Sequence, residues 1–564
     1  MPAGRDLRGM NFLENIFDRL RRSTERPVLQ QVDQGKLLSS NGRQVLGLVH
    51  SARTFLANAG LKKGDRCALL AANDVRWAAL DLAAMAEGII VVPLYSRQAS
   101  KELVGMMKDC APSLIVCGEA GLRDGVAQVW PQMPRAVLFE EIFVRGSGVA
   151  DDGRAPAPLA DSDPVTIIYT SGTSGEPKGV VLNVGNLNHM LRCTGERLDL
   201  LMGNASRPDR VFHYLPFCFA GSWILLLSCL SRNAVLTINT DLNRIKQDLE
   251  LTAPDYFLNV PTLLERIRTG ISDQISKRGG AARTIFDHTV KAYLRGQAGT
   301  SGVREAFWLM LAGALVFPRI RANIGPNLKA IICGSAPLAV ETQLFFMMLR
   351  IPVLQVYGLT ETTAICTMDD PHDVEPGKVG PAVPGVEMIL GENEEILVRG
   401  PNIFAGYWNR PQETARVLRD GWFHTGDQGE VDAGGNWRII GRIKNLIILN
   451  SGHNIAPEPL EDELLRRLLG AQQVVLVGNG CSFLAAIIAG TCQRSDVERV
   501  LEQFNQDLPH YKRIRAFHLS PEAFSVENGL LTANGKLKRD AVAARFQSEI
   551  DEIYTAAVGS AKPA

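Results

Sequence analysis

The stretch "YTSGTSGEPKGVVL", Tyr169 to Leu182, places Ser, Thr, Gly, Pro and Lys between two apolar runs. It departs from the common nucleotide-triphosphate loop, which requires Gly-x-x-x-x-Gly-Lys followed by Ser or Thr. Here four residues separate Gly172 from Pro177, and Lys178 follows. Hydroxyls, approachable backbone amides and a lysine suit polyphosphate oxygens. The stretch therefore predicts a phosphate-binding loop of different geometry, and an ordinary Ser/Gly-rich turn is the structural alternative.

The bulk composition is that of an ordinary globular protein with more than one domain. A chain of 564 residues is too long for a single core, and 46% of it is apolar. Its 60 basic and 60 acidic residues cancel, so no overall charge attracts nucleic acid. The ten cysteines form no C-x-x-C pair, and the N-terminus lacks the apolar core of a secretion signal. We expect reduced thiols and a cytoplasmic location.

The sequence predicts no membrane span, because no stretch approaches the ~20 apolar residues that a spanning helix needs. The longest candidate is "FWLMLAGALVF", Phe307 to Phe317. We interpret it as a buried helix, with a surface anchor resting among lipid headgroups as the alternative. Peripheral membrane contact therefore stays open.

Strand and helix patterns alternate through the first part of the chain. The predicted strands include "RCALLA", "IIVVPLY" and "PVTIIYT", and the predicted helices include "VLGLVHSARTFLANAG" and "WAALDLAAMAEG". This alternation indicates parallel βαβ units and a doubly wound sheet. Such sheets bind ligands beyond the carboxyl ends of their strands, which is where the loop after "PVTIIYT" lies.

The later part of the chain changes character twice. Residues 272–323 are rich in Arg, Lys and helix formers, and predict a helical excursion. From Val379 onward Gly, Pro and short strands indicate a barrel-like β region, and after "GRIKN" an α+β pattern of about 100 residues begins. We predict a large domain over 1–443, a small domain over 444–548 and a disordered tail over 549–564.

Four further motifs accompany the loop. They are "VYGLTETTA" (356–364), "GWFHTGDQGEV" (421–431), "GRIKNLIILNSGHNIAP" (441–457) and "LTANGKLKR" (531–539). Together and in this order they resemble the adenylate-forming superfamily of acyl-CoA synthetases, peptide-synthetase adenylation domains and luciferases. The resemblance implies an α/β fold: an N-terminal AMP-binding domain of doubly wound sheets plus a distorted β-barrel, and a small mobile α+β C-terminal domain.

The resemblance also implies ligands and residue roles. ATP, Mg²⁺ and either CoA or the phosphopantetheine of an acyl carrier protein are the implied partners, together with a small carboxylic acid. Lys536, Thr173 and Glu361 are the implied catalytic residues, and Glu361 is also the implied metal ligand. Without the motifs, Lys536 would be read as a solvated lysine and Glu361 as an exposed carboxylate.

The implied nucleotide and thiol contacts extend over both domains. Lys444 corresponds to the hinge of the small domain. In the family this domain turns about the hinge, so that a different face of it meets the active site in each half-reaction. The full set of implied binding residues is Thr170, Ser171, Gly172, Ser174, Gly175, Lys178, Gly334, Ser335, Ala336, Tyr357, Gly358, Thr360, Asp427, Arg442, Lys444, Ser451, Gly452 and His453.

The chemistry explains why no Ser-His-Asp arrangement is needed. A carboxylate is a poor electrophile, and its attack on the α-phosphate of ATP gives an acyl-adenylate with a better leaving group. Because carboxyl pKa values lie around 4, the acid is already ionised at neutral pH. The enzyme must supply alignment and positive charge around the α-phosphate.

The acid itself is predicted from finer likenesses. The excursion 272–323 and "FSVENGLLTANGKLKR" resemble long-chain acyl-CoA synthetases more than acetate, aryl or amino-acid relatives. The chain departs from the family at "YLPFCFAGSW", where Phe219 or a neighbour replaces a histidine at the acyl site, and at Asn445, where relatives often carry an acidic residue. We interpret Cys218 as core packing rather than as a nucleophile.

Three functions are compatible with these observations. The first is ATP-dependent formation of an acyl-CoA from a medium- or long-chain fatty acid. The alternative is an acyl-AMP ligase that loads a carrier protein or activates an aryl or other specialised acid. The third is a catalytically silent acyl-nucleotide sensor.

Overall fold

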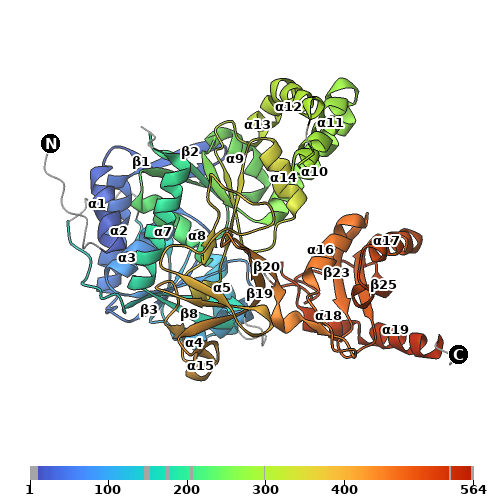
Figure 1. Ribbon diagram of the computed structural model, residues 1–564. Helices are drawn as coiled ribbons and strands as arrows, with labels where there is room; N and C mark the ends of the chain where they lie inside the picture. The colour runs from blue at the N-terminus through green and yellow to red at the C-terminus, as the bar shows by residue number, and fades with distance from the viewer. Residues whose placement is uncertain are drawn as a thin grey trace. The chain divides into compact units, whose positions relative to one another are not determined.

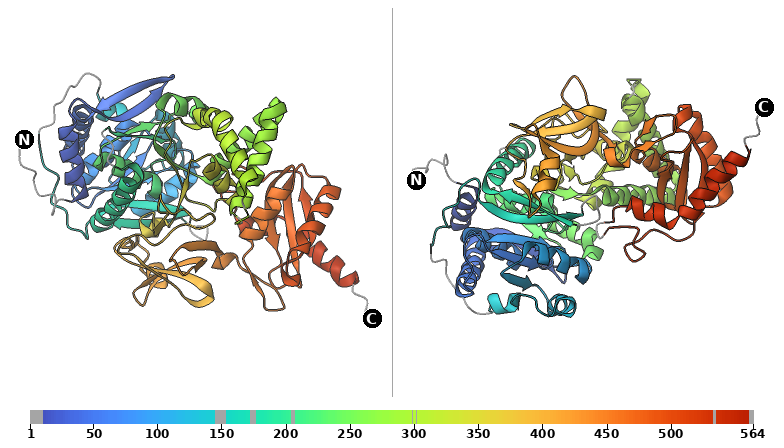
Figure 2. Two further views of the ribbon diagram at one scale, coloured as in Figure 1. Left: turned by 45° about the horizontal axis from the view of Figure 1, so that its top comes forward. Right: turned by 90° about the horizontal axis from the view of Figure 1, so that it is seen from below.

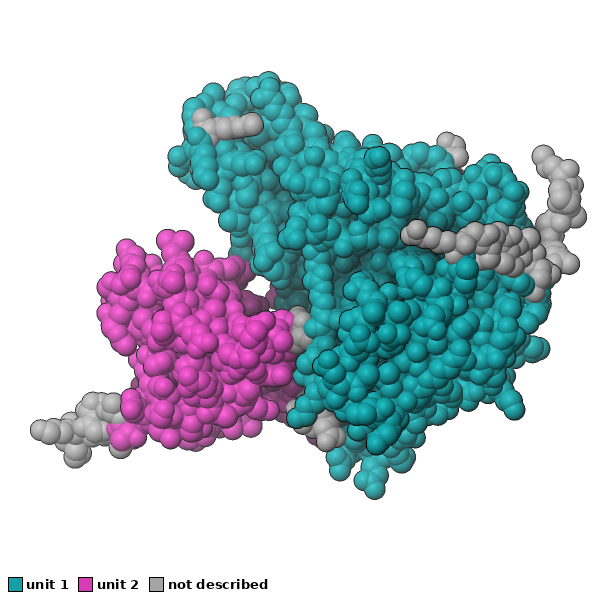
Figure 3. All heavy atoms as spheres, turned by 180° about the vertical axis from the view of Figure 1, so that it is seen from behind, with its two compact units in different colours: residues 1–388, 398–423, 431–437 teal, residues 389–397, 424–430, 438–564 magenta. Residues whose placement is uncertain are grey.

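The computed structural model describes residues 11–144, 153–171, 177–203, 207–297, 299–300, 302–532 and 535–560. Packing divides the chain into two units, coloured separately in Figure 3. Unit 1 comprises residues 1–388, 398–423 and 431–437, and unit 2 comprises residues 389–397, 424–430 and 438–564. This division does not follow one chain position, so the domain boundary at Lys444 stays a prediction.

One sheet of unit 1 has seven strands in the order β17-β8-β7-β4-β3-β5-β6. Its strands β3 and β8 are labelled in Figure 1. The strands are β17 (Gly406–Tyr407), β8 (Pro177–Asn183), β7 (Pro164–Ser171), β4 (Ile90–Leu94), β3 (Arg66–Leu70), β5 (Leu114–Cys117) and β6 (Ala136–Leu138). From β4 to β6 neighbouring strands are parallel and almost wholly buried, as expected for apolar runs covered on both faces. β7 and β8 pair antiparallel, so the opening loop connects a hairpin.

The second sheet of unit 1 has eight strands in the order β14-β13-β12-β11-β9-β10-β1-β2. The strands are β14 (Thr367–Met368), β13 (Val353–Tyr357), β12 (Ile331–Cys333), β11 (Tyr256–Asn259), β9 (Asp209–His213), β10 (Ala234–Ile238), β1 (Pro27–Asp33) and β2 (Lys36–Asn41). Pairing is parallel from β13 to β1, and only the edge strands β14 and β2 are antiparallel.

Helices cover these sheets and confirm the doubly wound α/β prediction. They are α1 (Phe12–Arg22), α2 (Gly42–Asn58), α3 (Val75–Ala86), α4 (Ser100–Cys110), α5 (Ala120–Val129), α6 (Phe139–Ile142), α7 (Val184–Met202), α8 (Ala220–Ser231), α9 (Ile245–Thr252) and α14 (Val340–Met348). Because α3 contacts both β4 and β1, it lies between the two sheets. All of its residues except Arg76 are buried, which suits a helix that is apolar on every side.

The predicted helical excursion is present as four helices, here called the α10–α13 segment (261–324). They are α10 (Pro261–Arg278), α11 (Gly280–Gln297), α12 (Val303–Leu315) and α13 (Phe317–Ile324). Figures 1 and 2 show them side by side, and they pack on α9 and α14. The prediction of a buried helix is wrong for α12, where Ala312 alone is buried.

The described residues contain no single helix that is long and apolar enough to cross a membrane. The pair α12 and α13 meets the length and composition criteria jointly, but it is bent by 51° at the break between the helices.

The region predicted to be barrel-like contains a five-stranded sheet, in which β15-β16-β19-β18 are successive and β20 pairs with β19. The strands are β15 (Glu387–Leu390), β16 (Glu395–Arg399), β18 (Leu418–Arg419), β19 (Trp422–Val431) and β20 (Trp437–Arg442), and α15 (Pro411–Val417) precedes β18.

Unit 2 also contains a hairpin and a three-stranded sheet with its own apolar core. Its elements are β21 (Ile447–Ile448), β22 (Asn454–Ile455), α16 (Glu458–Arg467), β23 (Ala471–Val477), β24 (Leu484–Gly490), α17 (Arg494–Gln506), β25 (Ile514–Ser520), α18 (Arg539–Arg545) and α19 (Gln547–Ser560). We predicted disorder from residue 549, but α19 occupies 549–560. Ile550 packs on an apolar cluster, and the Tyr554 hydroxyl donates to the carbonyl oxygens of Val477 and Phe483 at 3.1 and 3.0 Å.

A buried carboxyl group lies on α3 between the two sheets. Asp81 is 1% exposed and accepts a hydrogen bond from Trp223 Nε1 at 2.8 Å. Burial raises the pKa of Asp81 to about 7, although the Trp223 bond acts in the opposite direction. The group therefore holds its proton more tightly in the folded chain than in the unfolded one, and its contribution to stability falls as the pH rises between about 4 and about 7.

We expect Asp81→Asn to stabilise the protein most at high pH. Asn keeps an oxygen for Trp223 and has no charge to bury, so its advantage over Asp should be larger at pH 8 than at pH 5, by on the order of 2–3 kcal/mol. Thermal or denaturant unfolding at both pH values measures the difference. Asp507→Asn, at an exposed position, is the control. If Asp81→Asn raised the free energy of unfolding equally at both pH values, the raised pKa of Asp81 would be contradicted.

Candidate active site

Two predicted site segments follow adjacent parallel strands. Gly334 to Ala336 come after β12, and Tyr357 and Gly358 end and follow β13. Since Cys333 is in register with Gln355 in a parallel pair, the two segments leave the sheet at the same edge. This edge carries the carboxyl ends of the strands, where ligands of such sheets bind.

Both segments contain a glycine that has no room for a side chain. A Cβ atom on Gly334 would lie 2.7 Å from Val356 Cγ2, and one on Gly358 would lie 2.3 Å from the carbonyl oxygen of Ala364. Ser335, which follows Gly334, has φ = 72° and is exposed. The tight turn after Gly358 leads into a 3-10 helix, Thr360–Thr362, which presents Thr360 and Glu361 half-buried.

The Tyr407 hydroxyl connects Glu361 with the strand pair that carries the opening loop. It donates a hydrogen bond to Glu361 Oε1 at 2.8 Å. Tyr407 lies on β17, where it pairs with Val180 of β8, and its ring lies 5.3 Å from Lys178 Nζ. The predicted residues Glu361 and Lys178 thus both lie next to the side chain of Tyr407.

Lys178 also has a partner that the sequence reading missed. Its Nζ forms an ion pair with Glu413 at the start of α15, and the two side chains are 18% and 24% exposed. The hydrogen bond from Lys178 lowers the pKa of Glu413 below its ordinary value. Nothing in the stretch around Tyr407 and Glu413 pointed to these roles, because both contacts depend on the pairing of β17 with β8.

The opening loop is described only at its two ends. Thr170 pairs with Lys178, and Ser171 pairs with Pro177, so the ends of the loop lie next to each other. The predicted phosphate contacts Gly172, Thr173, Ser174 and Gly175 lie outside the described residues.

Three further predicted residues, Asp427, Arg442 and Lys536, belong to unit 2. Arg442 Nε, at the end of β20, lies 2.5 Å from Asp427 Oδ1 on β19, and the Asp427 side chain is 5% exposed. Surrounding protein lowers the pKa of Lys536, the Arg442 charge lowers it further, and the Asp427 charge opposes both. The Lys536 side chain nevertheless reaches solvent. The charges of Arg442 and Asp427 therefore describe its electrostatic surroundings better than burial does.

The backbone around Lys536 forms a tight turn. Thr532 N–H donates to the Lys536 carbonyl oxygen at 2.8 Å, and Lys536 N–H donates to Thr532 Oγ1 at 3.0 Å. Gly535 has φ = 75°, a conformation that glycine adopts without strain. The turn therefore fixes the backbone of Lys536 and leaves its long side chain to reach outward.

The predicted thiol-side residues form an exposed turn between β21 and β22. Ser451 Oγ lies 2.9 Å from His453 Nδ1, and the His453 ring stacks on Tyr511 at a centroid distance of 4.2 Å. Between them, Gly452 has φ = 82° and no atom within 4 Å of a Cβ position.

The predicted hinge residue Lys444 lies in a short 3-10 helix, Ile443–Asn445, and is exposed. Its neighbour Asn445 donates a hydrogen bond from Nδ2 to Glu458 Oε1 at 2.5 Å. A neutral amide thus contacts a carboxylate at the position where relatives often carry an acid.

The predicted acyl gate is aromatic. Phe219 directly precedes α8, and its ring centroid lies 5.5 Å from that of Tyr95. Cys218 is 8% exposed, and burial raises the pKa of its thiol to about 12. A thiol that is buried and protonated is a poor nucleophile, so the interpretation of Cys218 as core packing is confirmed.

In the described part of the chain the predicted metal ligand Glu361 does not belong to a protein cage for a metal ion. Among the described residues, no group of three or more His, Cys, Asp or Glu side chains could hold a metal ion. Magnesium is commonly bound by one or two carboxylates together with substrate phosphates and water, and a single glutamate fits that pattern.

The comparison with protein families assigns the chain. The family described as AMP-binding enzyme matches residues 17–408, and the AMP-binding enzyme C-terminal domain matches residues 444–558. The chain belongs to the AMP-binding enzyme family, and the predicted superfamily and fold are confirmed.

Named relatives of similar length are acid–thiol ligases. A long-chain-fatty-acid–CoA ligase of Mycobacterium bovis is 27% identical over 591 residues, covering 96% of this chain and 97% of the relative. A chloroplastic long-chain-fatty-acid–acyl-carrier-protein ligase of Arabidopsis thaliana is 27% identical over 593 residues, covering 88% of this chain and 80% of the relative. ATP-bound MatB from Rhodopseudomonas palustris has a similar fold, with a TM-score of 0.73 at 23% identity, covering 95% of this chain and 99% of that one.

We expect Gly358→Ala to destabilise the protein by roughly 1–3 kcal/mol, because the added methyl group meets the backbone of Ala364 and the turn after β13 must shift. Gly105→Ala is the matched control. Gly105 is an exposed residue of α4 with open space around it, and the change should raise stability by up to about 1 kcal/mol. Denaturant unfolding measures both changes, and unchanged stability of Gly358→Ala would show that the turn is not constrained.

Proposed function

We propose that this chain is an ATP-dependent acid–thiol ligase that activates a medium- or long-chain fatty acid and transfers the acyl group to CoA. The observation that carries the proposal is the ion pair of Asp427 with Arg442, whose two charges both act on Lys536. Such a group can bind a ribose and a phosphate of the same nucleotide.

The proposed roles follow from the chemistry of these side chains. An ionised carboxylate accepts hydrogen bonds, so Asp427 can accept from both ribose hydroxyls. Arg442 keeps that carboxylate oriented through the contact of 2.5 Å. Lys536 supplies positive charge to the α-phosphate, and the charge of a bound phosphate would favour its protonated form.

In the first half-reaction a carboxylate oxygen of the acid attacks the α-phosphorus of ATP. The bond between the α-phosphorus and the bridging oxygen breaks, and pyrophosphate leaves with the electron pair. Lys178 and the loop residues Thr170 to Gly175 are proposed to hold the phosphates that leave. Tyr357 is proposed to contact adenine at the edge where Gly334 and Gly358 shape the two tight turns.

Glu361 is proposed to hold Mg²⁺ against the phosphates. In the described part of the chain Tyr407 donates to Oε1, and the other oxygen, Oε2, is available to a cation. When bound, such an ion would offset the negative charge of the phosphates. Tyr407 orients the carboxylate, because its own position is fixed by the pairing of β17 with β8.

In the second half-reaction the thiol sulfur of CoA attacks the acyl carbon, the thiol proton is lost, and AMP leaves. Ser451, Gly452 and His453 are proposed to border the path of the thiol. Lys536 and this turn are needed in different steps, and we propose that rotation at Lys444 exchanges them.

An apolar acid is proposed because of the gate and the relatives. Phe219 and Tyr95 form an aromatic contact, which favours an apolar substrate chain. The two named relatives described above both act on long-chain fatty acids. The carrier-protein ligase among them favours one alternative, in which the acceptor is the phosphopantetheine thiol of an acyl carrier protein.

The proposed function is tested by AMP release with ATP, Mg²⁺ and a panel of acids of increasing chain length, together with acetate, benzoate and amino acids. We expect AMP release to rise with chain length when CoA is present. Replacing CoA by a phosphopantetheinylated carrier protein separates the two acceptors. AMP release with benzoate or amino acids alone would contradict the proposed acid, and no AMP release with any acid would contradict the whole function.

Two substitutions should affect opposite half-reactions. Lys536→Ala removes the proposed phosphate contact, and acid-dependent pyrophosphate exchange should fall by about 10²–10³-fold, while thioester formation from supplied acyl-adenylate largely survives. Gly452→Leu should do the reverse, since a side chain would occupy the exposed turn. It also strains a residue with φ = 82°, so unfolding should be measured alongside. Equal loss in both assays for either variant would exclude its assigned role.

A further inference from the structure

One face of α12 is apolar and exposed. Val303, Phe307 and Met310 are 90%, 50% and 66% exposed, and Ala314 is exposed as well. Their spacing of four, three and four residues places them along a single side of the helix. We call these four residues the α12 face. Leu315 is 55% exposed at the end of the same helix, and Leu294 of α11 is 46% exposed.

The α12 face belongs to the most basic part of the protein. The α10–α13 segment has ten Lys and Arg against four Asp and Glu, a surplus of six positive charges. The whole chain is neutral, so the remaining residues have six more acidic than basic groups. The basic residues are Arg266, Arg268, Lys277, Arg278, Arg283, Lys291, Arg295, Arg304, Arg319 and Arg321.

Internal ion pairs use only part of this charge. Arg295 lies 3.0 Å from Glu305, and Arg283 lies 3.6 Å from Asp287. Arg304, next to the α12 face, and Arg319, on α13, are exposed. Arg304 therefore places a cation next to the apolar face.

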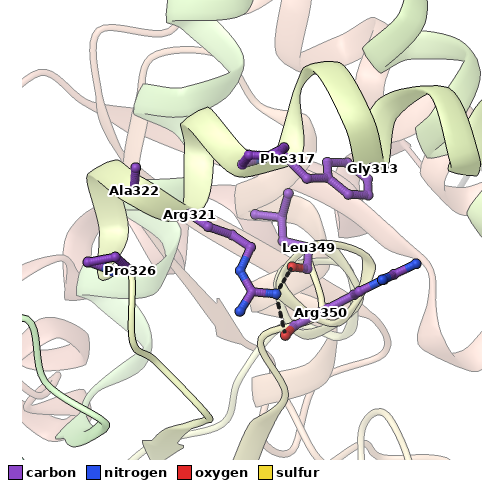
Figure 4. A pocket seen from close by; sticks show the side chains of 8 residues that line it. Gly313, Phe317, Arg321, Ala322, Pro326, Leu349 and Arg350 are labelled. Carbon is purple, nitrogen blue, oxygen red and sulfur yellow. Dashed lines mark hydrogen bonds between the residues drawn. The ribbon is translucent and has the colours of Figure 1, made fainter.

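A cavity of about 360 Å³ opens in the same segment, between the α12–α13 junction and the end of α14 (Figure 4). It is lined by Gly313, which precedes Ala314, and by the apolar side chains of Phe317 and Leu349. Arg321 also lines it, and its Nη1 donates long hydrogen bonds to the carbonyl oxygens of Leu349 and Arg350, at 3.4 and 3.3 Å. An apolar wall with a cation beside it suits one end of an anionic amphiphile.

We propose that the α12 face docks the protein on a lipid bilayer that contains anionic phospholipid. The apolar side chains would enter the boundary between headgroups and acyl chains, while exposed basic side chains of the segment, such as Arg304, face lipid phosphates. The 51° bend between α12 and α13 suits a pair of helices that rests in the interface. Two copies of the chain pairing through this face would bring two basic segments together, and charge repulsion disfavours that occupant.

If the proposed function holds, docking on a bilayer would bring the enzyme to its substrate. A long-chain fatty acid partitions into bilayers, since each methylene group that leaves water is stabilised there. An enzyme held at the bilayer surface would meet this acid where it is concentrated, whereas a short, water-soluble acid would gain nothing.

The test is sedimentation of the full-length protein with vesicles, without ATP or CoA. One set contains phosphatidylcholine alone and the other contains added phosphatidylglycerol. We expect binding to the anionic vesicles that weakens with salt, and a loss of about tenfold or more in the double variant Phe307→Glu with Met310→Glu. The matched control is Leu38→Glu with Leu469→Glu, which changes the same charge at side chains 53% and 94% exposed.

The outcomes separate the competing explanations. Equal vesicle binding by the wild type and the α12 double variant, or no binding of the wild type to anionic vesicles, overturns the proposal. A change in oligomeric state of the double variant without a change in vesicle binding assigns the face to a second copy and also overturns it. AMP release with a soluble short acid should be unchanged in the double variant. If vesicle binding behaves as expected but no acid is activated, docking stands and the proposed function fails.

Discussion

The hydrogen bond from Tyr407 to Glu361 is the contact on which the arrangement of unit 1 around the candidate site depends. Glu361 follows β13 of the eight-stranded sheet, whereas Tyr407 belongs to β17 at the edge of the seven-stranded sheet. The Tyr407 ring also lies beside Lys178, which pairs with Glu413. A carboxylate and a cation are thus held in place by neighbours before any substrate is present, which is the condition for electrostatic stabilisation without reorganisation.

Unit 2 contains a carboxylate that is fixed by an ion pair, Asp427, and a cation that projects from a backbone turn, Lys536. The Asp427 carboxylate is almost fully buried and is fixed by Arg442, so its acceptor oxygens have a defined direction. Lys536 instead projects from a tight backbone turn and keeps a long, solvent-reaching side chain. This contrast suits a reaction in which the sugar of the nucleotide must stay in place while the charge at its phosphate is needed for one step only.

Much of the fold could be predicted from sequence, because strands that are buried on both faces appear in it as continuous runs of apolar residues. The strands β3, β4 and β7 were predicted on that basis. The helices α2 and α3 were predicted from the alternation of strand and helix patterns, and the glycines at positions 334 and 358 through motif resemblance. Tyr407 and Glu413 were missed because β17 has only two residues, and pairing with a distant strand creates it. The exposure of α12 was missed for a related reason: an apolar composition does not reveal whether anything covers the helix. The tail was read as disordered from its small residues, whereas Ile550 and Tyr554 attach it to the sheet of unit 2.

The pairing of β17 with β8 also sets an order of events during synthesis. Gly406 pairs with Val181, a partner made 225 positions earlier in the chain. At roughly 5–20 residues per second, the ribosome needs about 10 to 45 seconds to produce the missing neighbour. For that time the nascent hairpin of β7 and β8 presents an unpaired edge, the kind of surface that templates aggregation. A chaperone that shields this edge would therefore raise the yield of folded protein, and truncated chains that end before residue 406 would never bury it.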